Sequence, residues 1–341
     1  MNSHRIDVRL SSRSYPVLVG HGVNQEIARF LPATARRAAI VTQADLPMID
    51  HLPIDTRTFM IDRGEATKSM STVEILCTGF AEMGLTRNDV VVAVGGGMVT
   101  DIAGFAAAVW HRGTPVIHVA TSLLAMVDAA IGGKTGVNLP QGKNLVGAFW
   151  QPTAVLCDLD VLESLPAREM RCGLGEVAKY HFLSGENLLA SSLDERVARC
   201  VSIKAAFVEE DERESGRRAL LNYGHTLAHA IESVGHHDLA HGEAVAVGLI
   251  FAAHLARALG RIDDDRVAYH ELVVGSTYGL HTRMPSGLDI DDLMTAMSRD
   301  KKALNGLTFI LDSERGIEIV SEIPPEIVRA ELHRFATSVA Q

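Results

Sequence analysis

The sequence predicts two domains, an α/β domain followed by a mostly α-helical one, from its length and from a change of pattern along the chain. The chain has 341 residues, more than one hydrophobic core usually organises. Short apolar runs alternate with helical patterns in the first part, whereas long helical patterns dominate after about Leu165. We therefore expect domains at residues 1–164 and 165–341.

The elements of the first domain follow from runs of β-branched residues. Ile6–Leu10 and Tyr15–Val19 are typical of a hairpin. Three further runs predict buried parallel strands: Ala38–Thr42, Val90–Val94 and Val116–Val119. Between Lys68 and Glu82, apolar residues at helical spacing predict a helix. This alternation of strands and helices favours an α/β nucleotide-binding domain.

The second domain carries mainly helical patterns. The predicted helices are Arg168–Phe182, Val197–Glu210, Gly224–Val234, Gly242–Leu259 and Ile290–Ser298. Two short runs, Leu307–Leu311 and Ile317–Val320, predict strands. We expect an active site in the crevice between the domains, the usual position in such proteins.

The charge balance excludes some classes of partner. Lys and Arg total 32 against 42 Asp and Glu, a net charge of −10. With no Lys/Arg run, this argues against nucleic-acid and anionic-membrane binding, which need a dense positive surface. A phosphorylated substrate stays open, because it needs only a few cations in one pocket.

Cysteine spacing and hydropathy predict a cytoplasmic protein. The four cysteines form no CxxC pair, which argues against disulfides or a zinc knuckle and fits a reducing compartment. The first ten residues lack the apolar core of a signal peptide. Apolar stretches such as Ala244–Ala256 are too short to span a bilayer.

Two glycine-rich segments could bind an anion. Gly95, Gly96 and Gly97 follow a predicted strand, where backbone amides and a helix N-terminus can approach a pyrophosphate. Their spacing is not GxGxxG, so a tight turn without a ligand is the alternative. The segment 127–144 combines glycines with two lysines and two asparagines, which are suitable anion donors. It lacks P-loop spacing, and an ordinary solvated loop is the alternative.

A third pattern offers metal ligands. His225 and His229 are four residues apart and share a helix face. Together with Glu176 and His241, His225 could form a three-ligand zinc site with one open position. His229 would then be a neighbour. Histidines at this spacing also occur by chance, and most of the 15 histidines are expected to have no metal role.

A fourth group is cationic and suits a substrate that carries both carboxylate and phosphate. Arginine can bind a carboxylate through two hydrogen bonds, and lysine can bind a phosphate through its single positive charge. Taken singly, each of these residues would be an ordinary surface charge. The group comprises Lys204, Arg217, Arg218, Lys301 and Lys302.

The ordered series of motifs resembles the 3-dehydroquinate synthase family, the sugar-phosphate cyclases of the shikimate route. From about Ile61 to Phe309 the chain contains GGGMVTDIAGF, Arg112-Gly113, VDAAIGGKTGVN, GKNLVGAFWQP, GLGEVAKY, LLNYGHTLAHAIE, HGEAVAVG and DKK. The resemblance implies an N-terminal NAD-binding α/β domain and a helical C-terminal domain that holds metal and substrate.

The resemblance also implies a reaction. The substrate would be 3-deoxy-D-arabino-heptulosonate 7-phosphate. NAD⁺ would oxidise its C5 hydroxyl transiently, phosphate would leave, NADH would return the hydride, and an aldol step would close the ring to 3-dehydroquinate. Zinc or cobalt on Glu176, His225 and His241 would act as a Lewis acid, and NAD would be regenerated in each turnover.

Residue roles carry over from the resemblance by motif position. The cofactor residues would be Glu65, Lys68, Gly95, Gly96, Gly97, Asp101, Thr121, Ser122, Lys134 and Lys143. Those facing sugar hydroxyls or carboxylate would be Asp128, Lys179, Lys204 and Arg218. Those around the phosphate would be Lys134, Asn144, Asn222, His229 and one of Lys301 and Lys302. Arg112 would reach the phosphate of a neighbouring subunit, so we expect a homodimer.

Some positions depart from the family pattern, and more than one function stays open. Gln43 stands where an Asp usually holds the adenine ribose, with Asp45 nearby. Ser122 and Val161 replace threonines. Cyclases of sedoheptulose 7-phosphate or glucose 6-phosphate have no substrate carboxylate. The presence here of Arg218, Lys301 and Lys302, which suit a carboxylate and a phosphate, therefore argues against these two activities. A synthase of amino-dehydroquinate, a metal-dependent polyol dehydrogenase and a non-enzymatic scaffold are the rival functions.

Overall fold

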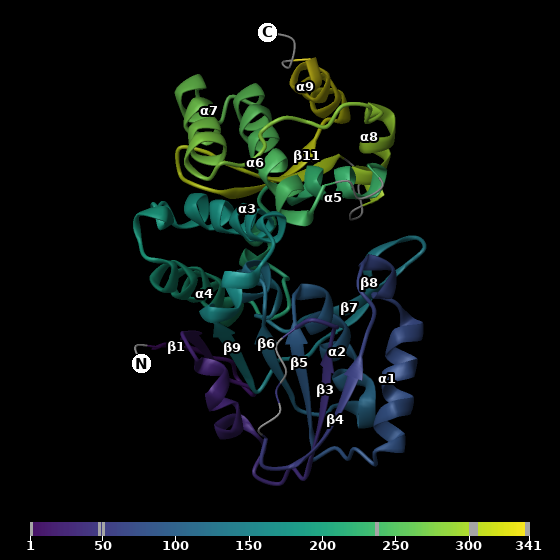
Figure 1. The fold of residues 1–341 in the computed structure, drawn as a ribbon. Coiled ribbons are helices and arrows are strands. Elements are labelled where there is room, and N and C mark those ends of the chain that lie inside the picture. Colours follow the sequence, from purple (N-terminus) through teal and green to yellow (C-terminus); the bar gives the residue numbers. More distant parts are fainter. Residues whose placement is uncertain (1–2, 47–48, 50–51, 236–238, 300–305, 338–341) are drawn as a thin grey trace. The chain divides into compact units, whose positions relative to one another are not determined.

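The computed structural model describes residues 3–46, 49, 52–235, 239–299 and 306–337 (Figure 1). The chain divides into two compact units, each built from two segments: Met1–Pro166 with Ser192–Arg213, and Ala167–Ser191 with Glu214–Gln341. The sequence analysis assigned Ser192–Arg213 to the second domain. The segment belongs instead to the first unit, because its helix α4 (Leu193–Glu210) packs on the two N-terminal strands.

Within the described residues, the first unit contains a seven-stranded sheet of order β1-β2-β9-β6-β5-β3-β4. The N-terminal strands β1 and β2 pair antiparallel as the predicted hairpin, and the other neighbours pair parallel. The strands are β1 (Ser3–Val8), β2 (Tyr15–Gly20), β3 (Arg37–Thr42), β4 (Asp55–Met60), β5 (Val90–Gly95), β6 (Val116–Ala120) and β9 (Ala154–Asp158).

The inner strand β5 explains why apolar runs in this chain are continuous rather than alternating. Val91 and Ala93 face a core formed with helices α1 (Met70–Glu82) and α2 (Gly97–Val109). Val92 and its neighbours on the other face pack with Ile27. Both faces of the sheet are therefore covered, as parallel sheets require. The α/β prediction for this unit is confirmed.

Part of the first unit departs from the sequence prediction. Strands β4 and β9 were not predicted: β4 (DTRTFM) is a largely polar and exposed edge strand, and β9 (AVLCD) is a short apolar run that periodicity does not identify as a strand. The glycine-rich segment 127–144, for which an ordinary loop was the alternative, leads into a hairpin of β7 (Lys134–Leu139) and β8 (Gly142–Phe149). Gly147 is needed for strand contact there, because a Cβ on it would lie 2.1 Å from the Thr135 carbonyl oxygen.

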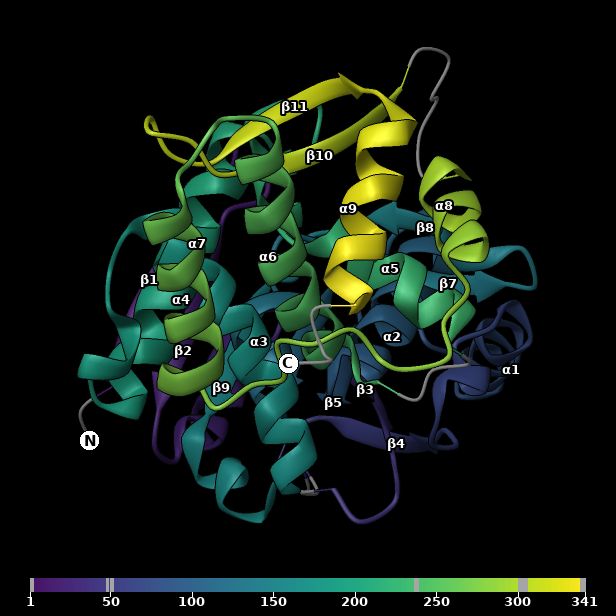
Figure 2. The same cartoon turned by 90° about the horizontal axis from the view of Figure 1, so that it is seen from above.

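Within its described residues, the second unit is helical apart from one hairpin, as predicted. Helix α6 is buried along most of its length and packs against α3, α5, α7 and α9 (Figure 2). Helices α7 and α9 were not predicted; α7 is short and polar, whereas α9 has 13 residues and buries Val328, Leu332 and Phe335 on one face. No described helix is long and apolar enough to cross a membrane. The elements are α3 (Ala167–Ser184), α5 (His225–Val234), α6 (His241–Ala258), α7 (Asp264–Glu271), α8 (Ile290–Arg299), β10 (Leu307–Leu311), β11 (Glu318–Ile323) and α9 (Pro325–Thr337).

A buried aspartate joins the starts of two parallel strands. Asp89 precedes β5, and its carboxylate accepts hydrogen bonds from the amides of Arg36 and Arg37 at 2.9 Å, beside β3. The other oxygen accepts from the amide and hydroxyl of Thr86 at 2.7 and 2.8 Å. Burial alone would raise the pKa of Asp89, but these hydrogen bonds outweigh it and lower the pKa.

We expect Asp89→Ala to lower the free energy of unfolding by about 2–3 kcal/mol, because buried amides lose their acceptor. The folded-state pKa of Asp89 is lowered, so its contribution is full above the unfolded pKa of about 4 and declines as pH falls through the folded value. Urea unfolding at pH 7 and pH 3 measures both effects. Asp62→Ala, at an exposed position, is the control; an equal loss in both variants would contradict this role.

Candidate functional site

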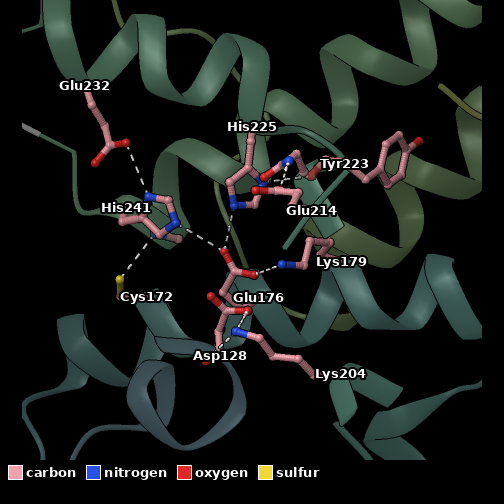
Figure 3. Close-up of polar contacts among 12 residues, drawn as sticks. Asp128, Cys172, Glu176, Lys179, Lys204, Glu214, Tyr223, His225, Glu232 and His241 are labelled. Carbon is pink, nitrogen blue, oxygen red and sulfur yellow. Dashed lines mark hydrogen bonds and ion pairs between the residues drawn. The ribbon is translucent and has the colours of Figure 1, made fainter. Parts of the chain in front are cut away.

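Three side chains from three helices converge in the second unit (Figure 3). Glu176 lies on α3, whereas His225 and His241 are the first residues of α5 and α6. One ligand atom from each lies within 4.8 Å of the others. The Nε2 atoms of His225 and His241 are 3.4 and 3.3 Å from Glu176 Oε1. The structure therefore brings together the three residues that the sequence analysis selected as metal ligands.

Close backbone contact between α3 and α6 places Glu176 beside His241. A Cβ on Gly175 would lie 2.1 Å from the Gly242 carbonyl oxygen, and one on Gly242 would lie 1.7 Å from that of Cys172. Only glycine permits this approach. Because these glycines directly precede Glu176 and follow His241, the helix contact sets the distance between the two side chains.

A second glycine contact places His225. Gly224 has a left-handed φ of 80°, and a Cβ on it would lie 2.9 Å from the Leu249 amide nitrogen. A Cβ on Gly248 of α6 would lie 1.9 Å from the Gly224 carbonyl oxygen. Helix α5 therefore begins directly against α6. The sequence analysis used these glycines only as motif letters and missed their packing role.

The hydrogen bonds of the two imidazoles fix which nitrogen faces the centre. His225 Nδ1 lies 3.1 Å from the Tyr223 carbonyl oxygen, which can only accept, so Nδ1 carries the proton. His241 Nδ1 lies 3.2 Å from Glu232 Oε2. In the neutral rings both Nε2 lone pairs then point toward the Glu176 carboxylate. Three acceptors at one point repel one another unless a proton or a metal ion lies between them.

Burial and charge make this group suitable for a divalent metal. Glu176 is 0% exposed, and its carboxylate oxygens face Lys179, His225 and His241. Burial would raise its pKa, but Lys179 and His225 outweigh it and hold the pKa well below the usual range. Burial lowers the pKa of His225, which keeps the ring neutral. An ionised carboxylate and a neutral imidazole are what a metal requires.

The environment of His241 also favours a positive charge at the centre. Burial lowers its pKa, but the contacts with Glu176 and Glu232 outweigh this effect and raise the pKa to about 10. The two carboxylates therefore attract either a proton or a metal ion to this imidazole. The set of one Glu and two His leaves a further coordination position open, as in catalytic zinc sites.

Predicted substrate residues of the second unit lie near these ligands or in the turn before α5. Lys179 is 1% exposed and forms an ion pair with Glu176. His229 is exposed, with its ring centroid 5.4 Å from that of His225. Arg218 is buried in the turn before α5, and Asn222 donates to Glu214 at 2.7 Å. The predicted Lys301 and Lys302 lie outside the described residues.

In the first unit, two predicted cofactor segments meet at the ends of neighbouring strands. Gly95 ends β5, and its carbonyl oxygen accepts from the Thr121 amide at 3.0 Å, just after β6. A Cβ on Gly96 would lie 3.3 Å from Ser122 Oγ. No side chain caps the N-terminus of α2, which begins at Gly97. This arrangement leaves backbone amides suited to an anion.

A polar network joins four more predicted site residues. Lys68 is buried, and its Nζ lies 2.5 Å from Asp101 Oδ2 and donates to Asn144 Oδ1 at 2.6 Å. Asn138, the last residue of VDAAIGGKTGVN, is one of the two asparagines that the sequence analysis noted as anion donors, but no site role was assigned to it. Its amide group donates to Glu65 Oε1 at 2.6 Å, and its oxygen accepts from the Asn144 amide at 2.9 Å. Asn138 thereby holds Asn144, whose φ is 56°.

The remaining predicted residues of this unit have the following positions. Lys204 of α4 is buried and donates to Asp128 Oδ1 at 2.9 Å. Lys134 is exposed at the start of β7, and Lys143 is half-buried in β8. Arg112 is exposed with a φ of 62°.

The two residues at the position where the family usually has the ribose-binding Asp, Gln43 and Asp45, both contact other residues of the chain. Gln43 donates to the Asp62 carbonyl oxygen at 3.0 Å. Asp45, which could replace the usual Asp, pairs with Arg63 at 3.1 Å and is exposed. An adenine ribose at this position would have to compete with the ion pair of Asp45.

Comparison with known proteins identifies the family. Residues 58–172 match the model described as 3-dehydroquinate synthase N-terminal, and residues 173–303 match 3-dehydroquinate synthase C-terminal. The chain belongs to the 3-dehydroquinate synthase family. A 3-dehydroquinate synthase of Nitrobacter winogradskyi is 41% identical over 96% of this chain and 95% of its own length. The family resemblance inferred from the motifs is confirmed.

Two further comparisons bear on substrate and fold. A protein of Amycolatopsis mediterranei named "Putative aminodehydroquinate synthase" is 51% identical over 97% of this chain and 94% of its own length. A solved 2-deoxy-scyllo-inosose synthase with carbaglucose-6-phosphate, NAD⁺ and Co²⁺ has a TM-score of 0.86 at 24% identity. It covers 97% of this chain and 100% of its own, and at this identity it supports the fold alone.

We expect Gly175→Ala to destabilise the protein although alanine normally favours a helix. The added methyl group meets the Gly242 carbonyl, so the free energy of unfolding should fall by about 1–3 kcal/mol, and the affinity for Co²⁺ should fall as α3 and α6 separate. Chemical denaturation and Co²⁺ titration measure the two effects.

Gly275→Ala is the matched control. Its nearest neighbour within 4 Å is the Thr282 methyl group at 3.2 Å, a side-chain atom that can move, so we expect little change. A Gly175→Ala variant with wild-type stability and Co²⁺ affinity would contradict the role of the glycine contact.

Proposed function

We propose that this protein is a 3-dehydroquinate synthase, a phosphate-eliminating cyclase that converts 3-deoxy-D-arabino-heptulosonate 7-phosphate to 3-dehydroquinate and phosphate. The observation that carries the proposal is the convergence of Glu176, His225 and His241 in a chain of this family. Relatives named 3-dehydroquinate synthase match nearly the whole chain at about 40% identity.

Two cofactors fit this chain, a divalent metal and NAD. Glu176, His225 and His241 would hold the metal, and the amides at Gly96 and Gly97 would face the nucleotide pyrophosphate. When bound, the pair supplies Lewis-acid and reversible redox chemistry at a substrate hydroxyl. Solved proteins with this fold contain NAD⁺ with Co²⁺ or Zn²⁺.

The remaining residues of the chain would bind and orient the substrate. Buried cations suit its carboxylate and hydroxyls, because burial strengthens charge-assisted hydrogen bonds; these are Lys179, Lys204 and Arg218, with Asp128 beside Lys204. The phosphate would be held by Lys134, Asn144, Asn222 and His229. Lys179 has a second effect, since its charge keeps Glu176 ionised.

A synthase acting on the amino analogue of the substrate is the second candidate. It is favoured by one observation, the 51% identity to the Amycolatopsis mediterranei protein against about 40% for the 3-dehydroquinate synthases. The two substrates differ by one nitrogen, and the proposed metal, carboxylate and phosphate residues suit both. Comparison of kcat/KM for the two substrates decides between them.

We expect the purified protein with the heptulosonate phosphate, NAD⁺ and Zn²⁺ or Co²⁺ to release phosphate without net NADH, because NAD is regenerated in each turnover. Removal of the metal by a chelator should abolish the release, and added Zn²⁺ or Co²⁺ should restore it. Glucose 6-phosphate, which lacks the carboxylate, is the control substrate. Accumulating NADH would indicate a dehydrogenase, and neither product, with the amino analogue also unconverted, would indicate a scaffold.

We further infer a cytoplasmic homodimer in which Arg112 completes the phosphate site of the neighbouring subunit. The exposed position of Arg112 in a left-handed turn supports this role. Arg112→Ala should then weaken substrate binding about ten- to a hundredfold, since a charge-assisted contact to phosphate contributes roughly 1.5–3 kcal/mol. NAD⁺ binding should be nearly unchanged. Calorimetry with each ligand measures both.

Mixing two inactive variants tests whether Arg112 acts across the interface. Arg112→Ala and Lys134→Ala subunits that exchange give about half mixed dimers, each with one intact site of two. Activity should recover toward about one quarter of wild type. Each variant exchanged with itself is the control. No recovery, with exchange proven by differently tagged subunits, would refute a shared site.

A further inference from the structure

A buried carboxylate outside the ligand set contacts one of the proposed ligands. Glu232 lies on α5, is 4% exposed, and its Oε2 lies 3.2 Å from Nδ1 of His241. This nitrogen is the one opposite to Nε2, which faces Glu176 at 3.3 Å. Figure 3 shows the His241 ring between the two carboxylates. Glu232 therefore contacts His241 on the side of the ring that faces away from Glu176.

A carboxylate in this position controls the imidazole in two ways. It accepts the Nδ1 proton, so the lone pair remains on Nε2, and it limits rotation of the ring. The other histidine, His225, obtains the same control from a backbone oxygen of Tyr223 at 3.1 Å. His241 begins α6, and its hydrogen bond comes from a side chain of another helix, so substitution can remove it.

We propose that Glu232 is a positioning residue that fixes the tautomer and orientation of His241 for metal binding. The inference rests on the metal centre of the proposed function. Glu232 also lies in a second group of possible ligands with His229 and His241, in which it would hold a metal directly. Glu232 is buried and contacts Nδ1 of His241, on the side of the ring away from Glu176, and both observations favour the positioning role.

Titration of the metal-free protein with Co²⁺ tests this inference without measuring activity. The affinity and the visible spectrum of bound Co²⁺ report ligand number and geometry. We expect Glu232→Ala to bind Co²⁺ about 10–100-fold more weakly than wild type, with an altered spectrum. Glu232→Gln keeps an oxygen that can accept from Nδ1, so its affinity should be intermediate. Both variants should bind at most as many Co²⁺ ions as wild type, namely one.

Glu243→Gln is the matched control. Glu243 is a buried glutamate in the first turn of α6, but it accepts from the Ala240 amide at 3.0 Å and pairs with Arg168 instead of an imidazole. We expect its Co²⁺ affinity and spectrum to match wild type. If Glu232→Ala does not fold, the comparison of Glu232→Gln with Glu243→Gln replaces it.

The possible outcomes separate the explanations. Wild-type affinity and spectrum in Glu232→Ala would overturn the positioning role. Equal losses in Glu232→Ala and Glu232→Gln would assign the effect to charge alone and also overturn it. Two Co²⁺ ions in wild type and one in the variants would make Glu232 a ligand of a second site. A wild type that binds no Co²⁺ would contradict the metal centre itself, and the positioning role with it.

Discussion

Backbone contact between helices at glycines is the constraint on which the second unit depends. Helices α3 and α6 touch at Gly175 and Gly242, and α5 begins against α6 at Gly224. No side chain fits at these points, so the helix backbones contact each other directly. Each proposed ligand is the sequence neighbour of one of these glycines. The packing of the unit and the geometry of its proposed metal site are therefore set by the same contacts.

The same packing makes the electrostatics of the site possible. Burying the carboxylates of Glu176 and Glu232 is unfavourable unless opposite charge or hydrogen-bond donors accompany them. Lys179 provides the charge beside Glu176, and His241 lies between the two carboxylates. The arrangement leaves two imidazole lone pairs and one carboxylate oxygen facing one point, a combination that a divalent cation satisfies.

The first unit arranges its residues by hydrogen bonds at the ends of parallel strands. The loops after β5 and β6 are joined by the bond from Thr121 to Gly95, and Asn138 links Glu65 to Asn144. Open α/β sheets bind ligands at the carboxyl ends of their strands. Here the polar side chains contact one another in the protein alone, which limits the rearrangement that a nucleotide would require.

The sequence by itself determined the α/β and helical regions, the family, and the three residues that converge in the second unit. Buried strands such as β5 were predictable because a strand buried on both faces has a continuous apolar run. The three proposed ligands were predictable because they lie in motifs of the family. Only the tertiary structure decided which residues and helices contact one another. It placed α4 in the first unit, gave Asn138 and Glu232 their contacts, and showed why Gly175 and Gly242 cannot be larger. The physical reason is that these hydrogen bonds and close contacts join residues that are distant in the chain. The spacing of residues within one segment does not reveal which distant residue each of them contacts.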